Sequence, residues 1–144
     1  MVIHFTNREM QRAWRDNYSG SSSAPHPKTN AHRLLLFYAV ECGLKALIMK
    51  RQNASSTDLV PEIYKLGHDL NKLLDHLRAG GGLRLKQQYK ICDLKKQNLS
   101  SQRNFDSSEI NQIWRYGGQA SETFFDKDIE ESLSKIADWI KKQI

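Results

Sequence analysis

Residues 30–51 read NAHRLLLFYAVECGLKALIMKR, and this stretch decides how the rest of the chain is arranged. It is long enough for about six helical turns, and in its middle nearly every residue is apolar apart from Glu41, Gly43 and Lys45. Apolar residues therefore face every direction around the axis, which is typical of a helix covered on most sides. Because the apolar run is shorter than the ~20 residues that cross a bilayer and contains charges, we expect the central helix of a bundle and no membrane span.

The composition is that of an ordinary globular domain. The 144 residues, 39% hydrophobic and 26% charged, predict a single domain over residues 1–144. The start, MVIHFTNREMQRAW, has no apolar run of signal-peptide length, so we expect a cytoplasmic protein. Cys42 and Cys92 read as buried free thiols rather than a disulfide or a metal site, because the histidines do not pair with them at the spacing of zinc ligands. We expect neither a metal nor a cofactor.

Capping and turn residues set the ends of the other helices in the first half. Thr6 with Glu9 has the pattern of a capping box, so a first helix begins there. Residues 19–28, SGSSSAPHPK, are rich in serine and contain prolines, which predicts a flexible loop. After the central helix, Pro61 opens a short helical turn and Asp69 opens a third helix with a stripe of leucines.

The second half of the chain also has a helical pattern. Residues 83–99 form the predicted fourth helix, although no clear apolar face is visible in it. Asp106 with Glu109 has the pattern of a second capping box at the start of a short helix, and a final amphipathic helix begins near Asp126. No stretch of strand length alternates between apolar and polar residues. We therefore expect an all-α protein, an up-and-down bundle of about four to five helices.

Basic residues are concentrated between Arg84 and Arg103, where the chain has six of them against one acidic residue. With a net charge of +6 for the whole chain, this favours an anionic partner. A lysine-rich solvated face is the alternative interpretation. The predicted basic patch consists of Arg84, Lys86, Lys90, Lys95, Lys96 and Arg103.

Three segments occur in an order and spacing that resemble a known family. They are AVECGLKALI at 39–48, GHDLNKLLDHL at 67–77 and IWRYGG at 113–118, and a closing amphipathic helix follows them. The pattern is similar to that of the HEPN family, named for nucleotide-binding domains of higher eukaryotes and prokaryotes. The resemblance implies a compact helical bundle that pairs as a homodimer, with a cleft between subunits near Arg115 and Tyr116.

The catalytic branch of this family consists of metal-independent ribonucleases. These carry an arginine and, after about four to six intervening residues, a histidine, which moves the 2′-hydroxyl proton while the arginine stabilises the phosphate charge. In this chain the positions after Arg115 that would hold the histidine are Ala120, Ser121 and Glu122. No arginine of the sequence has a histidine at that distance. The sequence therefore departs from the ribonuclease branch.

The candidate ligand-binding residues are those that can recognise a phosphate or a base. Arg115 can donate two hydrogen bonds to a phosphate and Tyr116 can stack on a base, or else the pair anchors a short helix and Arg115 binds a carboxylate such as Glu41. Glu41 with Lys45 is either a structural pair or, as the resemblance implies, part of the site, facing the Arg115 region. His68 is either a polar residue at a helix start or, in a ribonuclease with a substituted site, the catalytic partner of Arg115.

Together with the resemblance, these patterns predict a non-catalytic module that binds a nucleotide or RNA phosphates. The resemblance implies that it is a dimer, of the kind found in toxin–antitoxin or antiphage systems. The first alternative is a metal-independent HEPN ribonuclease in which Arg115 and His68 form a substituted active site. The second is a protein-interaction subunit, the partner of a separate nucleotidyltransferase. We expect no membrane contact in any of the three.

Overall fold

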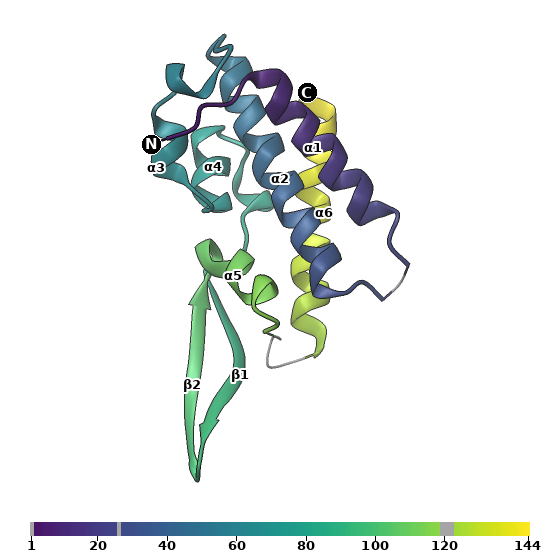
Figure 1. Ribbon diagram of the computed structural model, residues 1–144, viewed down its shortest axis with the longest axis vertical. Helices are drawn as coiled ribbons and strands as arrows, with labels where there is room; N and C mark the ends of the chain where they lie inside the picture. Colours follow the sequence, from purple (N-terminus) through teal and green to yellow (C-terminus); the bar gives the residue numbers. More distant parts are fainter. Residues whose placement is uncertain (1, 26, 119–122) are drawn as a thin grey trace.

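The computed structural model describes residues 2–25, 27–118 and 123–144. Its body is built from three long helices, α1 (Asn7–Ser22), α2 (Asn30–Arg51) and α6 (Thr123–Gln143). Helix α2 packs against α1 along one side and against α6 along another (Figure 1). Within the described part of the chain, none of the helices has the length and apolarity needed to span a membrane.

Helix α2 is the centre of the hydrophobic core, as the sequence predicts, and begins and ends at the predicted residues. Eleven of its residues are buried, among them the polar exception Glu41. Gly43 lies where α2 meets the other two long helices, because a Cβ atom built there would be 2.9 Å from Ile140 Cδ1 and 3.0 Å from Trp14 Cε3. The absence of a side chain at this position therefore allows the three helices to approach closely.

Short helices connect the long ones. The capping box predicted at Thr6 is present at the start of α1, and that predicted at Asp106 is present at the start of a 3-10 turn that leads into α5. Both follow from local hydrogen bonds between a short polar side chain and the backbone three residues on. The short elements are η1 (Thr57–Leu59), α3 (Glu62–Leu66), α4 (Leu70–His76), η2 (Gly81–Leu83), η3 (Ser107–Glu109) and α5 (Ile110–Arg115).

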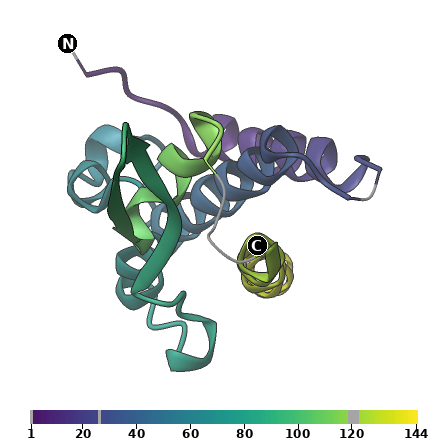
Figure 2. The ribbon, with the colours of Figure 1, turned by 90° about the horizontal axis from the view of Figure 1, so that it is seen from below.

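The prediction of an all-α bundle is wrong, because the segment read as a fourth helix forms a β-hairpin. Strand β1 (Gln88–Lys96) pairs in antiparallel fashion with β2 (Leu99–Asp106). Figure 1 shows the hairpin extending from the body beside α5, and Figure 2 shows it from its tip. The protein is therefore a mixed α and β structure with a two-stranded sheet.

The physical reason for the error is that only the base of the hairpin is buried. Tyr89 and Ile91 alternate with exposed residues, and Tyr89 stacks on Phe105 with ring centroids 5.2 Å apart. A bulge between Ile91 and Leu94 then breaks the alternation, and the outer part of both strands is exposed. The alternation of apolar and polar residues that marks a strand therefore extends over too few residues to be recognised in the sequence.

Two other predictions also need correction. Residues 19–22 belong to α1 and not to a loop. Ser21 is fully buried, and a Cβ atom built at Gly20 would be 3.2 Å from Leu35 Cδ1 of α2. Tertiary packing against α2 therefore extends the helix beyond the point that its serines favour. Residue 26, in the middle of the predicted loop, lies outside the described residues. Cys92 is exposed on β1 rather than buried, and Cys42 is only partly buried.

Candidate functional site

Three of the predicted site residues meet in one cluster, which we call the Glu41 cluster (Glu41, Lys45 and His68). Glu41 and Lys45 are one turn apart on α2, and Lys45 Nζ donates to Glu41 Oε2 across 3.4 Å. His68, in the link between α3 and α4, places its Nδ1 2.5 Å from Glu41 Oε1. The chain reaches this position through Gly67, whose φ of 55° favours glycine. Both oxygens of one buried carboxylate are thus engaged by basic groups.

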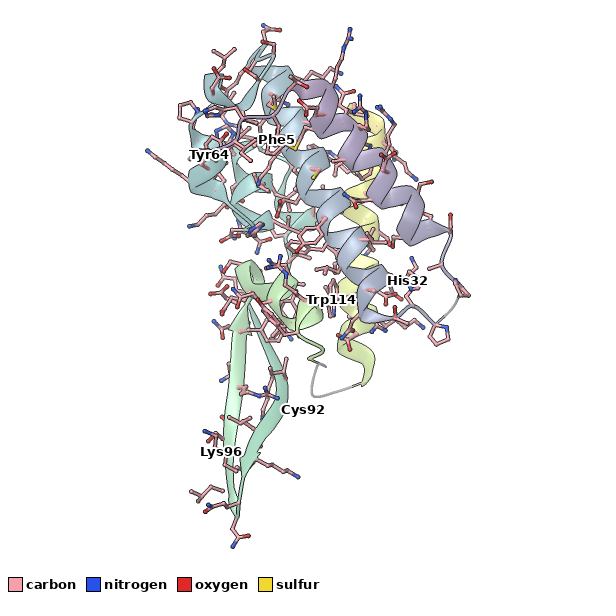
Figure 3. All side chains as sticks on the ribbon, in the orientation of Figure 1. Phe5, His32, Tyr64, Cys92, Lys96 and Trp114 are labelled. Atoms are coloured by element: carbon pink, nitrogen blue, oxygen red, sulfur yellow. The ribbon has the colours of Figure 1, made fainter. Side chains whose placement is uncertain are left out.

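The Glu41 cluster forms one wall of a pocket of about 460 Å³. The other walls are mainly apolar and include Phe5 from the N-terminal segment, Met10 from α1 and Ile63 from α3. Figure 3 shows Phe5 and Tyr64 close together at the end of the molecule where this pocket lies. The sequence gives no sign of the apolar walls, because they come from separate elements.

Cys42, next to Glu41 on α2, also lines the pocket. Burial raises the pKa of its thiol to about 11, and the neighbouring Glu41 carboxylate adds to the effect. A thiol is nucleophilic only as the thiolate. At neutral pH, Cys42 is therefore an inert wall residue and not a nucleophile of the pocket.

This pKa predicts that the two cysteines react at different rates with an alkylating reagent. At pH 8, about one in a thousand Cys42 side chains is a thiolate, so iodoacetamide should modify the exposed Cys92 at least tenfold faster, an order-of-magnitude expectation. Because the thiolate fraction of Cys42 rises about tenfold per pH unit below its pKa, its rate should rise in that way between pH 8 and pH 10. Mass spectrometry of peptides after timed alkylation measures both rates; equal rates at pH 8 would contradict the assignment.

Arg115 does not belong to the Glu41 cluster. It is exposed at the end of α5 and donates a hydrogen bond to the hydroxyl of Tyr38, with its guanidinium 5.9 Å from the centre of the Tyr38 ring. The hydrogen bond that Arg115 donates to Tyr38 is the main cause of a raised pKa of Arg115. Tyr38 lies one turn before Glu41 on α2, so Arg115 is near the Glu41 cluster but not paired with it. Tyr116, beside Arg115, is 77% exposed.

A polar network that the sequence does not reveal fixes the helix that carries Arg115. Trp114 Nε1 donates to Asp126 Oδ1 across 3.0 Å, which ties α5 to α6. Arg33 of α2 pairs with Glu130 and lies 3.9 Å from Asp126. These contacts join α2, α5 and α6, so the backbone at Arg115 is held on a rigid support. The positions 120–122, which would hold the histidine of the ribonuclease motif, lie outside the described residues.

The predicted basic patch is divided between two places. Arg84 pairs with Asp75 at the end of α4, and Lys86 follows it before the hairpin. Lys90, Lys95, Lys96 and Arg103 are carried by the strands of the hairpin, on which Figure 3 labels Cys92 and Lys96. Arg103 Nε donates to the carbonyl oxygen of Cys92 across 2.9 Å, at the bulge. The hairpin therefore turns a basic run of sequence into a protruding basic element.

The described residues contain no group of three or more His, Cys, Asp or Glu side chains that could hold a metal ion. Comparisons with protein-family models, with curated proteins and with solved structures found no match for this chain. No relative therefore tests the resemblance to the HEPN family, which stays a prediction drawn from short motifs.

Proposed function

We propose that this protein is a non-catalytic module that binds nucleic acid, RNA in the first place, through phosphate contacts. The observation that carries the proposal is the arm, which we define as residues 90–104, the outer part of the hairpin, exposed beyond the buried Ile91. Its cations are Lys90, Lys95, Lys96 and Arg103, and its only acidic residue is Asp93. Clustered cations on a protruding element favour phosphate binding, because each contact releases counterions from the nucleic acid.

The packing of the arm supports this interpretation. Between Cys92 and Asn104 no residue is buried, so the arm has no hydrophobic core of its own. A two-stranded hairpin without such support is marginally stable in water. A bound partner would supply the missing contacts, and a two-stranded ribbon is narrow enough to lie in a nucleic-acid groove or along a single strand.

Arg115 and Tyr116 offer a second point of contact. The guanidinium of Arg115 is exposed, and its anchor on Tyr38 presents it at the surface beside the ring of Tyr116. An arginine can bind a phosphate through two parallel hydrogen bonds, and an exposed aromatic ring can stack on an unpaired base. Because bases are accessible in single-stranded RNA, this arrangement favours RNA over duplex DNA.

The ribonuclease alternative requires a histidine that can act together with Arg115. His68, the candidate for that role, binds Glu41, while Arg115 binds Tyr38. Neither the hydrogen bonds nor the ion pairs of these two side chains bring them together in the described part of the chain. We therefore propose binding without cleavage.

The binding proposal predicts a salt-dependent affinity that rests on the arm. The double variant Lys95→Glu with Lys96→Glu should bind a labelled single-stranded RNA about tenfold more weakly. The slope of log affinity against log salt should become shallower by about 1.4, because two phosphate contacts are lost and each contributes about 0.7 on a single strand. Lys127→Glu with Lys135→Glu is a matched control, since both lysines are exposed on α6 and the change in net charge is the same. Fluorescence anisotropy measures the affinities.

Parallel titrations with single-stranded RNA, double-stranded RNA and double-stranded DNA distinguish the possible nucleic acids. Equal weakening by the control variant, or no binding to any of the three, would overturn the proposal. Gel analysis of the RNA after incubation without metal tests the ribonuclease alternative. Cleavage that disappears in Arg115→Ala would show an enzyme in place of a binding module.

One observation favours a second candidate, a protein-interaction subunit. Alternate residues of β2 lie on the same face of the hairpin, and so do the residues of β1 that pair with them. Leu94 and Leu99 therefore lie on the face that carries Tyr89 and Phe105 at the base of the hairpin. Leu94 is 42% exposed and Leu99 is 76% exposed. This outer face, which also carries Lys96 and Arg103, could hold a second copy of the chain, as the resemblance implies, or a separate nucleotidyltransferase domain. Sedimentation of the protein and of Leu94→Ser with Leu99→Ser tests the homodimer: a dimer that the leucine variant abolishes would support it.

A further inference from the structure

The pocket beside the Glu41 cluster lies on a different surface from the arm and is chemically unlike it. We propose that this pocket binds a small molecule with an apolar body and a single carboxylate group. Its volume of about 460 Å³ lies within the range of small-molecule sites in proteins, about 300–1,000 Å³. This ligand site is separate from the proposed nucleic-acid surface and does not depend on it.

The walls of the pocket suit an apolar ligand body. Phe5, Met10, Ala13 and Ile63 contribute apolar side chains from three parts of the chain. Glu9 also lines the pocket, and its carboxylate accepts hydrogen bonds from the backbone N–H and the hydroxyl of Thr6. Apolar walls hold a ligand by removing its apolar surface from water. They are also unsuited to a nucleotide, whose several phosphate charges would be desolvated there.

The wall that contains Phe5 is fixed in place by backbone hydrogen bonds. The N–H of Phe5 donates to Thr57 Oγ1 across 3.0 Å, and the N–H of Thr57 donates to the carbonyl oxygen of Phe5 across 2.9 Å. The hydroxyls of Tyr64 and Thr57 lie 2.7 Å apart, which joins α3 to the same point. The pocket is therefore already formed without a ligand, so little order has to be gained on binding.

The polar wall of the pocket supplies hydrogen-bond donors. The side chain of Lys45 is only 13% exposed, and its ammonium group has three donors. One of them reaches Glu41 Oε2 across a long 3.4 Å, and Nζ makes no other hydrogen bond to the described residues. Buried donors normally have acceptors. A carboxylate bound in the pocket would be that acceptor for Lys45.

Glu41 is not the residue that binds the charged group of a ligand. Its two oxygens are already occupied by His68 and Lys45, and its side chain is 9% exposed. It is therefore a poor binding site for a cationic group of a ligand. His68, 52% exposed at the edge of the pocket, adds a second basic group on the same side. The arrangement selects an acceptor with a single negative charge over a cation.

The test uses anilinonaphthalene sulfonate, a fluorescent probe with an apolar body and one anionic group, and octanoate as the competitor. The folded protein should bind the probe with saturation at one site, and octanoate should displace it much better than octanol, which has the same chain length without the charge. Displacement by octanol and octanoate alike would overturn the carboxylate assignment. Absence of saturable binding would overturn the site.

Variants locate the site. Lys45→Met keeps the length of the side chain but removes the donors, and it should weaken probe and octanoate binding about tenfold, as expected for loss of a charge-assisted hydrogen bond. Lys72→Met is the control, because Lys72 is exposed on α4 and does not line the pocket. Ala13→Leu fills the pocket without changing its charges and should also abolish binding, which keeps the test valid if Lys45→Met does not fold. Unchanged binding in Ala13→Leu, checked for folding by circular dichroism, would refute the location.

The two binding proposals can fail separately. The arm variant Lys95→Glu with Lys96→Glu should bind octanoate like the original protein, and Ala13→Leu should bind RNA like it. Loss of octanoate binding in the arm variant would contradict the separation of the two sites.

Discussion

Replacing Gly43 by leucine is expected to lower the free energy of unfolding by about 3 kcal/mol, because overpacking costs about 1–3 kcal/mol or more and outweighs the gain in helix propensity. Gly43 has no side chain at the point where α2 meets α1 and α6. Even a Cβ atom there would be 2.9 Å from Ile140 Cδ1 and 3.0 Å from Trp14 Cε3. A leucine must therefore displace both neighbours and separate the long helices.

The size of this effect can be measured by urea unfolding, or as a decrease in Tm of about 10 °C for a domain of this length. Gly82→Leu is the matched control, since a Cβ at Gly82 would have no atom within 4 Å. That variant should change the stability by less than about 0.5 kcal/mol. Equal stability of the Gly43 and Gly82 variants would show that the three helices do not pack as described.

Replacing Glu41 by methionine is expected to lower the stability by about 3 kcal/mol, because it leaves a largely buried lysine without its counter-charge. Lys45 Nζ has one recorded hydrogen bond, to Glu41 Oε2, and the side chain of Lys45 is 13% exposed. His68 loses its carboxylate partner as well. Chemical denaturation of the purified variant measures the loss.

The double variant, Glu41→Met with Lys45→Met, distinguishes two contributions to the loss of stability. One is the cost of leaving Lys45 without its partner, and the other is the cost of losing the Glu41–Lys45 interaction itself. Removal of both charges of a buried pair costs little when apolar groups of similar volume replace them, so the double variant should recover most of the stability. Asp75→Met, which breaks the exposed pair with Arg84, is the control and should cost less than about 1 kcal/mol. A double variant less stable than the single one would contradict the interpretation that the loss in Glu41→Met comes from the unpaired Lys45.

The positions of Glu41 and Lys45 explain why a core helix carries charges at all. The cost of burying them is offset within the Glu41 cluster by His68, which the link after α3 brings to Glu41 Oε1. Lys45 and His68 are also the basic residues that line the apolar pocket. We expect stability and ligand binding to be coupled there, since a ligand that accepts from Lys45 stabilises the folded protein by mass action.

The sequence alone determined those features that depend on neighbours a few residues apart. The ends of α2, the capping boxes at Thr6 and Asp106, and the pair of Glu41 and Lys45 are all present as predicted. Each is set by hydrogen bonds or charges within one helical turn or by the uninterrupted apolar character of one segment. Such local interactions leave a pattern in the sequence that does not depend on the rest of the fold.

Only the tertiary structure decided the hairpin and the two candidate sites. Tyr89 and Phe105 stack across sixteen residues of sequence, and the strands between them bury too little to show a regular alternation. The pocket joins Phe5 to Glu41 and His68, and Arg115 meets Tyr38 from the far end of the chain. These contacts are made by segments that the fold brings together, so no local pattern records them, and the arm and the pocket could be recognised only once the elements were placed in space.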